Sequence, residues 1–135
     1  MEQSPYILLI DDDADDRKMF IDQFRHHDTE VGIQSADSGE GALSYLHDCL
    51  PDDLPILIVV DYQMPGLYAP AFLQAIQHNF RYDKIVKVVW STSGSQECID
   101  RCMGSGADKY FIKPCDLVGL DEIICYINHI LHAWG

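Results

Sequence analysis

Three apolar runs that each end in a reactive polar residue decide the fold: YILLIDDD at residues 6–13, ILIVVDYQMPG at 56–66 and KVVWSTSG at 87–94. A fourth run, KYFIKP at 109–114, ends in lysine. Short apolar runs bounded by turn signals indicate strands buried on both faces, and sites in open parallel sheets form where such strands end. The sequence therefore places five polar residues at one edge of one sheet: Asp11, Asp12, Asp61, Ser91 and Lys113.

Strand signals alternate with helix signals along the chain, which predicts a parallel sheet with crossover helices on both faces. We expect strands near residues 6–10, 31–36, 56–60, 85–90 and 109–112. Apolar residues at helical spacing mark five helices: Met19, Phe20 and Phe24; the segment GEGALSYL at 39–46; Phe72, Leu73 and Ile76; Ile99 and Met103; and a series from Leu120 to Trp134 that Asp116 is placed to cap. This alternation predicts an α/β, flavodoxin-like doubly wound (βα)5 fold with a five-stranded parallel sheet in the order 2-1-3-4-5.

Composition narrows the classes of function. The 135 residues fit one domain, so we expect residues 1–135 to form a single domain without an output domain. A formal net charge of −13 argues against direct binding to nucleic acid. The 5 cysteines include no Cys-x-x-Cys pair, so we expect free packing thiols and neither disulfides nor a zinc site. No signal peptide and no run of membrane-spanning length is present, which predicts a cytoplasmic protein without membrane insertion.

The predicted cluster of three aspartates requires a compensating positive charge. Like charges raise one another's pKa values and destabilise the ionised cluster formed by Asp11, Asp12 and Asp61. Mg²⁺ suits such a cluster because it prefers carboxylate and carbonyl oxygens, and Lys113 would add a second, fixed positive charge. A carboxylate beside Mg²⁺, a lysine and a hydroxyl has the parts that phosphoryl transfer requires, which makes Asp61 the candidate nucleophile.

Each of these residues also has a plainer interpretation. An aspartate at the end of a strand can be a turn former or a helix cap, and the acidic run at residues 11–16 can be a solvated turn. Ser91 or Lys113, taken alone, can be an ordinary surface side chain. The shared site is favoured because four separate strands end in an acid pair, an acid, a hydroxyl and a lysine, in that order.

Taken together, the segments resemble the response-regulator receiver domains of two-component signalling. The matching pieces are LLIDDD at 8–13, SADSGEGALSYL at 35–46, LIVVDYQMPG at 57–66, WSTSG at 90–94 and GSGADKYFIKP at 104–114. The resemblance implies a single-domain response regulator and phosphorelay protein rather than a turnover enzyme. It would accept a phosphoryl group on Asp61 from a sensor histidine kinase or histidine phosphotransfer protein and pass the signal to a downstream protein target.

The same resemblance implies a set of ligands for Mg²⁺. Asp12 and Asp61 would bind the metal directly together with the backbone carbonyl of Gln63, and Asp11 would reach it through water. Lys113 would pair with the acceptor carboxylate and then with the phosphoryl group. The third aspartate of the LLIDDD segment would not be a ligand.

The resemblance also implies a switch. Ser91 takes the position of the switch hydroxyl, and Tyr110 that of the switch aromatic, with an ordinary half-buried strand tyrosine as the alternative. Movement of Ser91 toward the phosphoryl group would let Tyr110 rotate inward and reshape the face made by the fourth helix, fifth strand and fifth helix. Partners would bind that face, and a homodimer could form through it. Pro114 matches a proline that has the cis form in the family.

Two segments depart from the family pattern. Tyr68, Ala69 and Pro70 replace the usual acid and glycine before the third helix, which predicts a later start or a different tilt for that helix. The segment LHDCLPDDLP at 46–55 lengthens the connection to the third strand and is expected to be a surface insertion.

Two other classes of function stay open. A haloacid-dehalogenase-like phosphohydrolase also has an Asp-x-Asp motif after a strand, as Asp11 and Asp13 do here. That class expects threonine or valine where Asp15 stands, and its serine and lysine come before its last acidic motif, whereas Asp61 precedes both here. An unphosphorylated pseudo-receiver scaffold is the second alternative, and the complete set of acid, hydroxyl and lysine argues against it.

Overall fold

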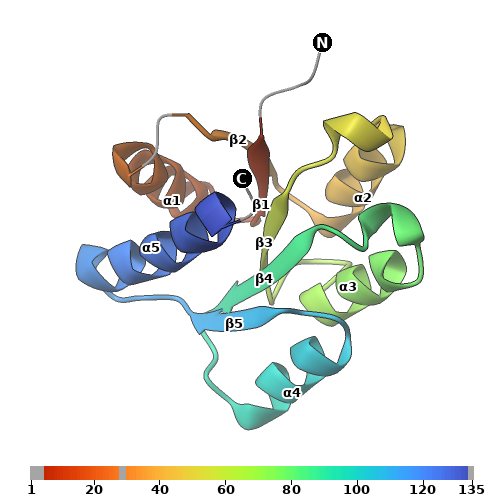
Figure 1. Cartoon of the computed structure of the whole chain (residues 1–135). Helices are drawn as coiled ribbons and strands as arrows, with labels where there is room; N and C mark the ends of the chain where they lie inside the picture. Colours follow the sequence, from red (N-terminus) through yellow and green to blue (C-terminus); the bar gives the residue numbers. More distant parts are fainter. Residues whose placement is uncertain (1–4, 28–29, 134–135) are drawn as a thin grey trace.

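The computed structural model describes residues 5–27 and 30–133, which contain a five-stranded parallel sheet between two layers of helices (Figure 1). The strands are β1 (Tyr6–Ile10), β2 (Gly32–Ala36), β3 (Leu57–Asp61), β4 (Val86–Ser91) and β5 (Lys109–Ile112). Their order is β2-β1-β3-β4-β5, and each neighbouring pair is parallel. The predicted doubly wound fold and its strand order are confirmed.

Helices alternate with the strands as the sequence predicted. They are α1 (Ala14–His27), α2 (Gly39–Asp48), α3 (Ala69–Gln77), α4 (Gln96–Gly104) and α5 (Leu117–Ala133). Two short 3-10 helices, η1 (Pro51–Asp53) and η2 (Phe80–Tyr82), lie in the connections before β3 and β4. Helices α1 and α5 lie side by side on one face of the sheet, and α2, α3 and α4 cover the other (Figure 1).

Each face of the sheet has its own apolar core because successive strand residues point to opposite faces. Ile7, Leu9 and Trp90 face α1 and α5, whereas Leu8 and Ile10 face the other three helices. Every residue of β1 and β3 is buried, but the edge strands β2 and β5 are only partly covered. The expectation of strands buried on both faces therefore holds for the centre of the sheet and is wrong for β5.

Several helix residues differ from the expected core positions. Met19 and Met103 are 37% and 44% exposed, so neither belongs to the core. Phe20 and Phe24 fill the buried stripe of α1 at a spacing of four residues, and Cys102 is the buried residue of α4. Trp134, expected in the last helix, lies outside the described residues.

The ends of two helices follow from local sequence. Asp116 caps α5 as predicted, because its Oδ1 accepts the Gly119 N–H at 2.9 Å. Helix α3 begins at Ala69 with Pro70 in its first turn, where the missing N–H of proline leaves no hydrogen bond unmade. The lengthened connection before β3 contains η1 and is fastened by the Tyr6 hydroxyl, which donates to the Asp53 carbonyl at 2.6 Å.

All five cysteines are free thiols, as expected. Cys102 is buried, and Cys49 and Cys98 are half-buried. Cys115 and Cys125 are exposed, so the expectation that all five pack in the core is wrong for these two. None of the helices in the described ranges combines the length and apolar character that crossing a membrane would require.

Candidate functional site

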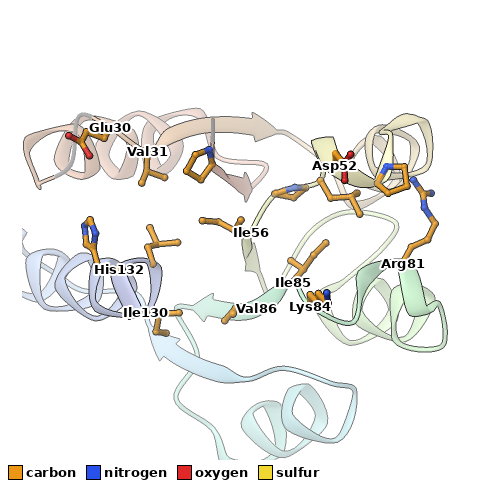
Figure 2. Close-up of a pocket in the computed structure, with 15 residues that line it drawn as sticks. Glu30, Val31, Asp52, Ile56, Arg81, Lys84, Ile85, Val86, Ile130 and His132 are labelled. Atoms are coloured by element: carbon orange, nitrogen blue, oxygen red, sulfur yellow. The ribbon is translucent and has the colours of Figure 1, made fainter. Parts of the chain in front are cut away.

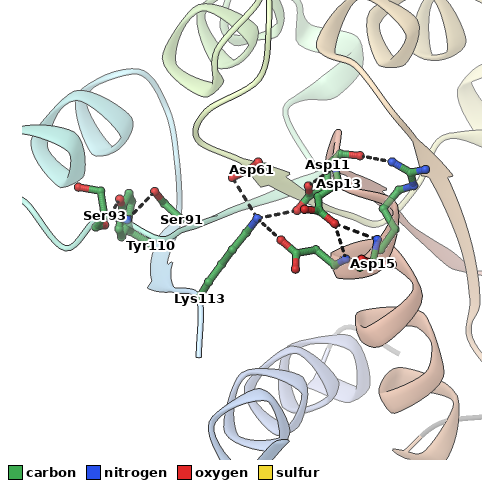
Figure 3. A network of polar contacts seen from close by, with 10 residues as sticks. Asp11, Asp13, Asp15, Asp61, Ser91, Ser93, Tyr110 and Lys113 are labelled. Atoms are coloured by element: carbon green, nitrogen blue, oxygen red, sulfur yellow. Dashed lines mark hydrogen bonds and ion pairs between the residues drawn. The ribbon is translucent and has the colours of Figure 1, made fainter. Parts of the chain in front are cut away.

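The carboxyl ends of the central strands bring the predicted polar residues to one edge of the sheet (Figure 3). Asp61 is the last residue of β3, Ser91 is the last residue of β4, and Asp11 directly follows β1. Lys113 directly follows β5. Strands β3 and β4 pair with Asp61 opposite Trp90, so both strands end at the same level. Strand topology therefore positions each of these groups.

Asp11, Asp12 and Asp61 form the one acidic cluster of metal-binding size in the described part of the chain. One carboxylate oxygen from each lies within 4.8 Å of the others. Asp11 is fully buried and Asp61 is 6% exposed, whereas Asp12 is open to solvent. Burial, followed by the charge of Asp11, raises the pKa of Asp61 to about 6, although Lys113 acts in the opposite direction. The cluster is therefore ionised at an energetic cost.

Lys113 provides the positive charge that partly offsets this cost. Its Nζ lies 2.8 Å from Asp16 Oδ2, 2.9 Å from Asp11 Oδ2 and 3.4 Å from Asp61 Oδ1. Burial alone would lower the pKa of Lys113, but hydrogen bonds and charge from Asp16, Asp11 and Asp61 outweigh burial and raise the pKa above its ordinary value. The ammonium therefore stays charged across the physiological pH range. Its side chain also lies over the Trp90 ring, with Nζ 4.8 Å from the ring centroid.

Two residues of α1 reach this site without having been predicted. Asp16 pairs with Lys113, and Arg17 donates from Nη1 to the Asp11 carbonyl at 2.7 Å. The acidic run at 11–16 gave no sign of which carboxylate turns toward the pocket.

Asp13 is the cap of α1. Its Oδ1 accepts the N–H groups of Asp15 and Asp16 at 2.9 and 3.0 Å, and its own N–H donates to Asp11 Oδ1 at 2.9 Å. The plainer interpretation of a strand-end aspartate thus applies to this residue. Asp13 orients Asp11 through the backbone and directs its own carboxylate to the helix.

The oxygens that remain unengaged suit a hard divalent cation. Asp12 forms no hydrogen bond or ion pair within the residues that the structure describes, and Asp61 meets Lys113 through Oδ1. Asp11 is engaged at both oxygens, by the Asp13 N–H and by Lys113. Three carboxylates near a single lysine leave excess negative charge. The cluster of Asp11, Asp12 and Asp61 could therefore hold a metal ion.

Ser91 and Tyr110 are both linked to the loop that follows β4 (Figure 3). Ser91 is buried, and its Oγ accepts the Ser93 N–H at 3.0 Å. Tyr110 is half-buried, and its hydroxyl donates to the Ser93 carbonyl at 2.6 Å. Burial raises the pKa of Tyr110, so this hydroxyl remains a donor near neutral pH. Gln63 is exposed and lies two residues beyond Asp61.

The bond between Lys113 and Pro114 is trans, because no cis peptide bond occurs in the described ranges. The sequence left the isomer of this bond open, and the structure has the trans form. The Lys113 N–H donates to the Ser91 carbonyl at 2.6 Å, which continues the pairing of β4 with β5 by one residue. This hydrogen bond places the lysine at the pocket with a trans bond.

A cavity of about 620 Å³ lies at the opposite edge of the sheet (Figure 2). Its walls are mostly apolar and include Val31, Ile56, Ile85 and Ile130. None of the predicted site residues lines it; Asp52, Arg81 and Lys84 lie toward one end, and Glu30 lies with His132 at the other (Figure 2). The predicted reactive side chains therefore lie at the carboxyl edge of the sheet and not in this cavity.

Comparisons with known proteins agree with the family resemblance of the sequence segments. Residues 7–125 match the family model described as the response regulator receiver domain. The two-component response regulator ARR5 of Arabidopsis thaliana is 30% identical over 126 residues, which cover 87% of this chain and 67% of that protein. ORR12 of Oryza sativa subsp. japonica is 29% identical, with 92% of this chain and 98% of that protein covered. The chain spans only 60% of ARR8 and 55% of ARR3, two further response regulators of Arabidopsis thaliana.

Solved structures share the fold. The phosphorylated cyanobacterial phytochrome response regulator RcpA superposes with a TM-score of 0.86 at 20% identity, covering 98% of this chain and 97% of that chain. The chemotaxis response regulator CheY4 of Vibrio cholerae gives a TM-score of 0.77 at 20% identity, with coverage of 93% and 99%. At these identities the similarity establishes the fold alone.

Proposed function

The chain belongs to the response regulator receiver domain family, and from that premise we propose that Asp61 accepts a phosphoryl group from a histidine kinase or histidine phosphotransfer protein. The observation that carries the proposal is the setting of Asp61. Its carboxylate ends β3, is 6% exposed, and lies 3.4 Å from the ammonium of Lys113. Asp11 shares the burial, the lysine and the acidic cluster, but its Oδ1 accepts the Asp13 N–H and its Oδ2 pairs with Lys113, whereas Asp61 meets Lys113 through Oδ1.

The transfer uses an oxygen of Asp61 as the nucleophile. This oxygen attacks phosphorus, a P–O bond forms, the P–N bond of the phosphohistidine breaks, and its electron pair stays on the imidazole nitrogen. With a pKa of about 6, Asp61 is largely ionised near pH 7 and needs no base. The charged Lys113 neutralises a phosphoryl oxygen. Attack of water on phosphorus later breaks the bond between phosphorus and the Asp61 oxygen, which releases inorganic phosphate and returns the free carboxylate.

We propose the set of Mg²⁺ ligands that the family resemblance implies. Asp12 and Asp61 would bind the ion directly with the backbone carbonyl of Gln63, and Asp11 would act through water. The contacts at both Asp11 oxygens support this division, as does Asp12, which has no hydrogen bond or ion pair among the residues that the structure describes. Bound Mg²⁺ would supply charge neutralisation at the phosphoryl oxygens. Response regulator Rcp1, which shares the fold with a TM-score of 0.78 at 20% identity, has been solved in a Mn²⁺-bound form.

The conformational change caused by phosphorylation would be transmitted through the loop after β4. The Ser91 hydroxyl can turn to a phosphoryl oxygen, which releases the Ser93 N–H and changes the loop that also holds Tyr110. Tyr110 then moves with the loop and alters the face made by α4, β5 and α5. That face exposes Ile112, Leu117 and Val118, apolar side chains that a downstream protein or a second copy of the chain could cover. In this proposal residues 1–135 act as one receiver domain.

Mass spectrometry after incubation with acetyl phosphate and Mg²⁺ tests the proposal. The native chain should gain one phosphoryl mass, and Asp61→Asn should gain none. Equal labelling of both chains would remove Asp61 from its role, and a native chain that stays unlabelled would favour the pseudo-receiver scaffold. Incubation with p-nitrophenyl phosphate should give negligible turnover, whereas sustained turnover would favour a phosphohydrolase.

A further inference from the structure

Lys113 is held more closely by Asp16 than by the proposed phosphoacceptor. Its Nζ lies 2.8 Å from Asp16 Oδ2 and 3.4 Å from Asp61 Oδ1. The contact with Asp16 is a hydrogen-bonded ion pair between a lysine side chain that is 11% exposed and a carboxylate that is 29% exposed. Asp11 Oδ2 lies 2.9 Å from the same nitrogen, so in the unphosphorylated protein the ammonium is shared among three carboxylates, and its nearest partner, Asp16, belongs to α1.

Asp16 is fixed in place by the start of α1. Its backbone N–H donates to the capping Oδ1 of Asp13 at 3.0 Å, which anchors the first turn of the helix. Asp15 lies beside it in the same turn, is exposed, and makes no ion pair with Lys113 within the described ranges. The chain thus contains two adjacent acids with the same charge, and only one of them touches the lysine.

Trp90 supports the ammonium from the same side. The Trp90 ring centroid lies 4.8 Å from Lys113 Nζ, and the ring packs edge-on against Phe20 of α1 at 5.3 Å between centroids. Trp90 belongs to the core between the sheet and helices α1 and α5. Asp16 and Trp90 therefore both draw the ammonium toward α1, and Figure 3 shows its nitrogen between Asp61 and the acidic start of that helix.

We propose that Asp16 is a positioning residue that restrains the Lys113 ammonium toward α1 before phosphorylation and thereby slows phosphorylation of Asp61. The proposal rests on the phosphoacceptor role of Asp61. A phosphoryl group adds a charge of about −1.5 to −2 and three acceptor oxygens, so it attracts the ammonium more strongly than Asp16 does. Until that charge arrives, the pairing with Asp16 must be loosened for Lys113 to move fully onto the acceptor.

The test compares two matched variants, Asp16→Asn and Asp15→Asn, in phosphorylation by acetyl phosphate with Mg²⁺. Both remove one negative charge from the same turn, but only Asp16→Asn removes an ion-pair partner of Lys113, which then keeps Asp11 as its near partner. We expect Asp16→Asn to be phosphorylated about fivefold faster than Asp15→Asn, the factor that matches a partly exposed ion pair of about 1 kcal/mol. Equal rates in the two variants would overturn the positioning role, because charge alone would then explain any acceleration.

A second measurement does not depend on phosphorylation. The indole N–H signal of Trp90 in an NMR spectrum should shift in Asp16→Asn, because the ammonium changes its position relative to the ring, and should keep its native position in Asp15→Asn. An unchanged signal in Asp16→Asn would contradict the restraint directly. Failure of the proposed function looks different: the native chain would remain unlabelled by acetyl phosphate, while the Trp90 signal would still report where Lys113 lies.

Discussion

The Asp61 carboxylate destabilises the folded protein when no cation neutralises its surroundings. Its pKa is raised from 3.8 to about 6, first by burial and then by the charge of Asp11. An acid whose folded pKa exceeds its unfolded value binds its proton more tightly when folded. The raised pKa of Asp61 therefore lowers the free energy of unfolding above about pH 6. This penalty disappears as the pH falls from about 6 toward 4. A shift of about two units corresponds to about 3 kcal/mol.

Asp61→Asn should therefore stabilise the metal-free protein. We expect the free energy of unfolding at pH 7 to rise by about 1 to 3 kcal/mol, because the amide keeps the shape of the side chain and carries no charge to bury. Urea unfolding between pH 4.5 and 7.5 without Mg²⁺ measures the change. Asp15→Asn, at an exposed acid, is the control and should leave the curve nearly unchanged. A less stable Asp61→Asn would contradict the burial penalty.

Mg²⁺ should stabilise the native protein through the acidic cluster. A ligand that binds only the folded state at 100 times its dissociation constant adds about 2.7 kcal/mol, which corresponds to a rise of roughly 5 to 10 °C in Tm for a domain of this size. Calorimetry with Mg²⁺ and then with a chelator measures the rise and its reversal. Asp12→Asn should lose most of it, whereas Asp83→Asn, at an exposed acid after η2, should keep it. Equal shifts in both variants would exclude Asp12 as a ligand.

At the scale of elements, the strands could be predicted closely because their apolar runs are short and sharply bounded. The bounds of β1 and β5 agree with the expected ranges, and β3 and β4 each begin and end one residue later than expected. That difference is physical: Asp61 and Ser91 are the last residues of their strands, so the ladder itself holds these reactive groups. Parallel strands ending at one edge made the juxtaposition with Lys113 predictable.

Helix contributions to the site could not be predicted in the same way. Five of the six residues at 11–16 are aspartate, and composition does not show that one caps α1 while another pairs with Lys113. Which aspartate faces Lys113 depends on how the first turn of α1 is rotated about the helix axis. The capping residue sets that rotation. Likewise, Met19 and Phe20 are adjacent apolar residues, and only the rotation of the helix decides that Phe20 is the buried one.

The capping role of Asp13 predicts a purely structural effect of mutation. Asp13→Ala removes the acceptor for two N–H groups of α1 and should lower the free energy of unfolding by about 1 kcal/mol, while the proposed labelling of Asp61 should persist. Denaturant unfolding and mass spectrometry after acetyl phosphate treatment measure the two properties. Asp13→Ser retains a capping oxygen and should recover most of the stability. Loss of labelling in Asp13→Ser would instead make the Asp13 carboxylate part of the metal site.

Across the whole molecule, burial is distributed unevenly. Helix α5 contributes Leu120, Ile123, Ile124, Ile127 and Leu131 to the core, whereas Cys102 is the one buried side chain of α4. The neighbouring edge strand β5 is also only partly covered. Elements with few buried apolar contacts open at low free energy and are those that move in switches. The side of the molecule formed by α4 and β5 is therefore the part that the proposed phosphorylation of Asp61 would reshape at least cost.

Hydrogen exchange should show this asymmetry. In the unphosphorylated protein, we expect amides of α4 to exchange faster than those at the centre of α5, because α4 has less buried surface to hold it closed. Phosphorylation should slow exchange in the loop after β4 and in α4, since Ser91 and the loop gain a new partner, and should leave α2 nearly unchanged. Mass spectrometry with and without acetyl phosphate measures both patterns.

Two variants separate a transmitted change from a general gain in stability. Asp61→Asn should show no response to acetyl phosphate. Tyr110→Ala removes the hydroxyl that donates to the Ser93 carbonyl, so the response should remain in the loop and fail to reach the exposed face of β5. Slowing of exchange that is uniform across all helices would mean that phosphorylation only stabilises the fold. A change confined to the loop, α4 and β5 requires the coupling through Ser91 and Tyr110, because these side chains join the acceptor edge to that face.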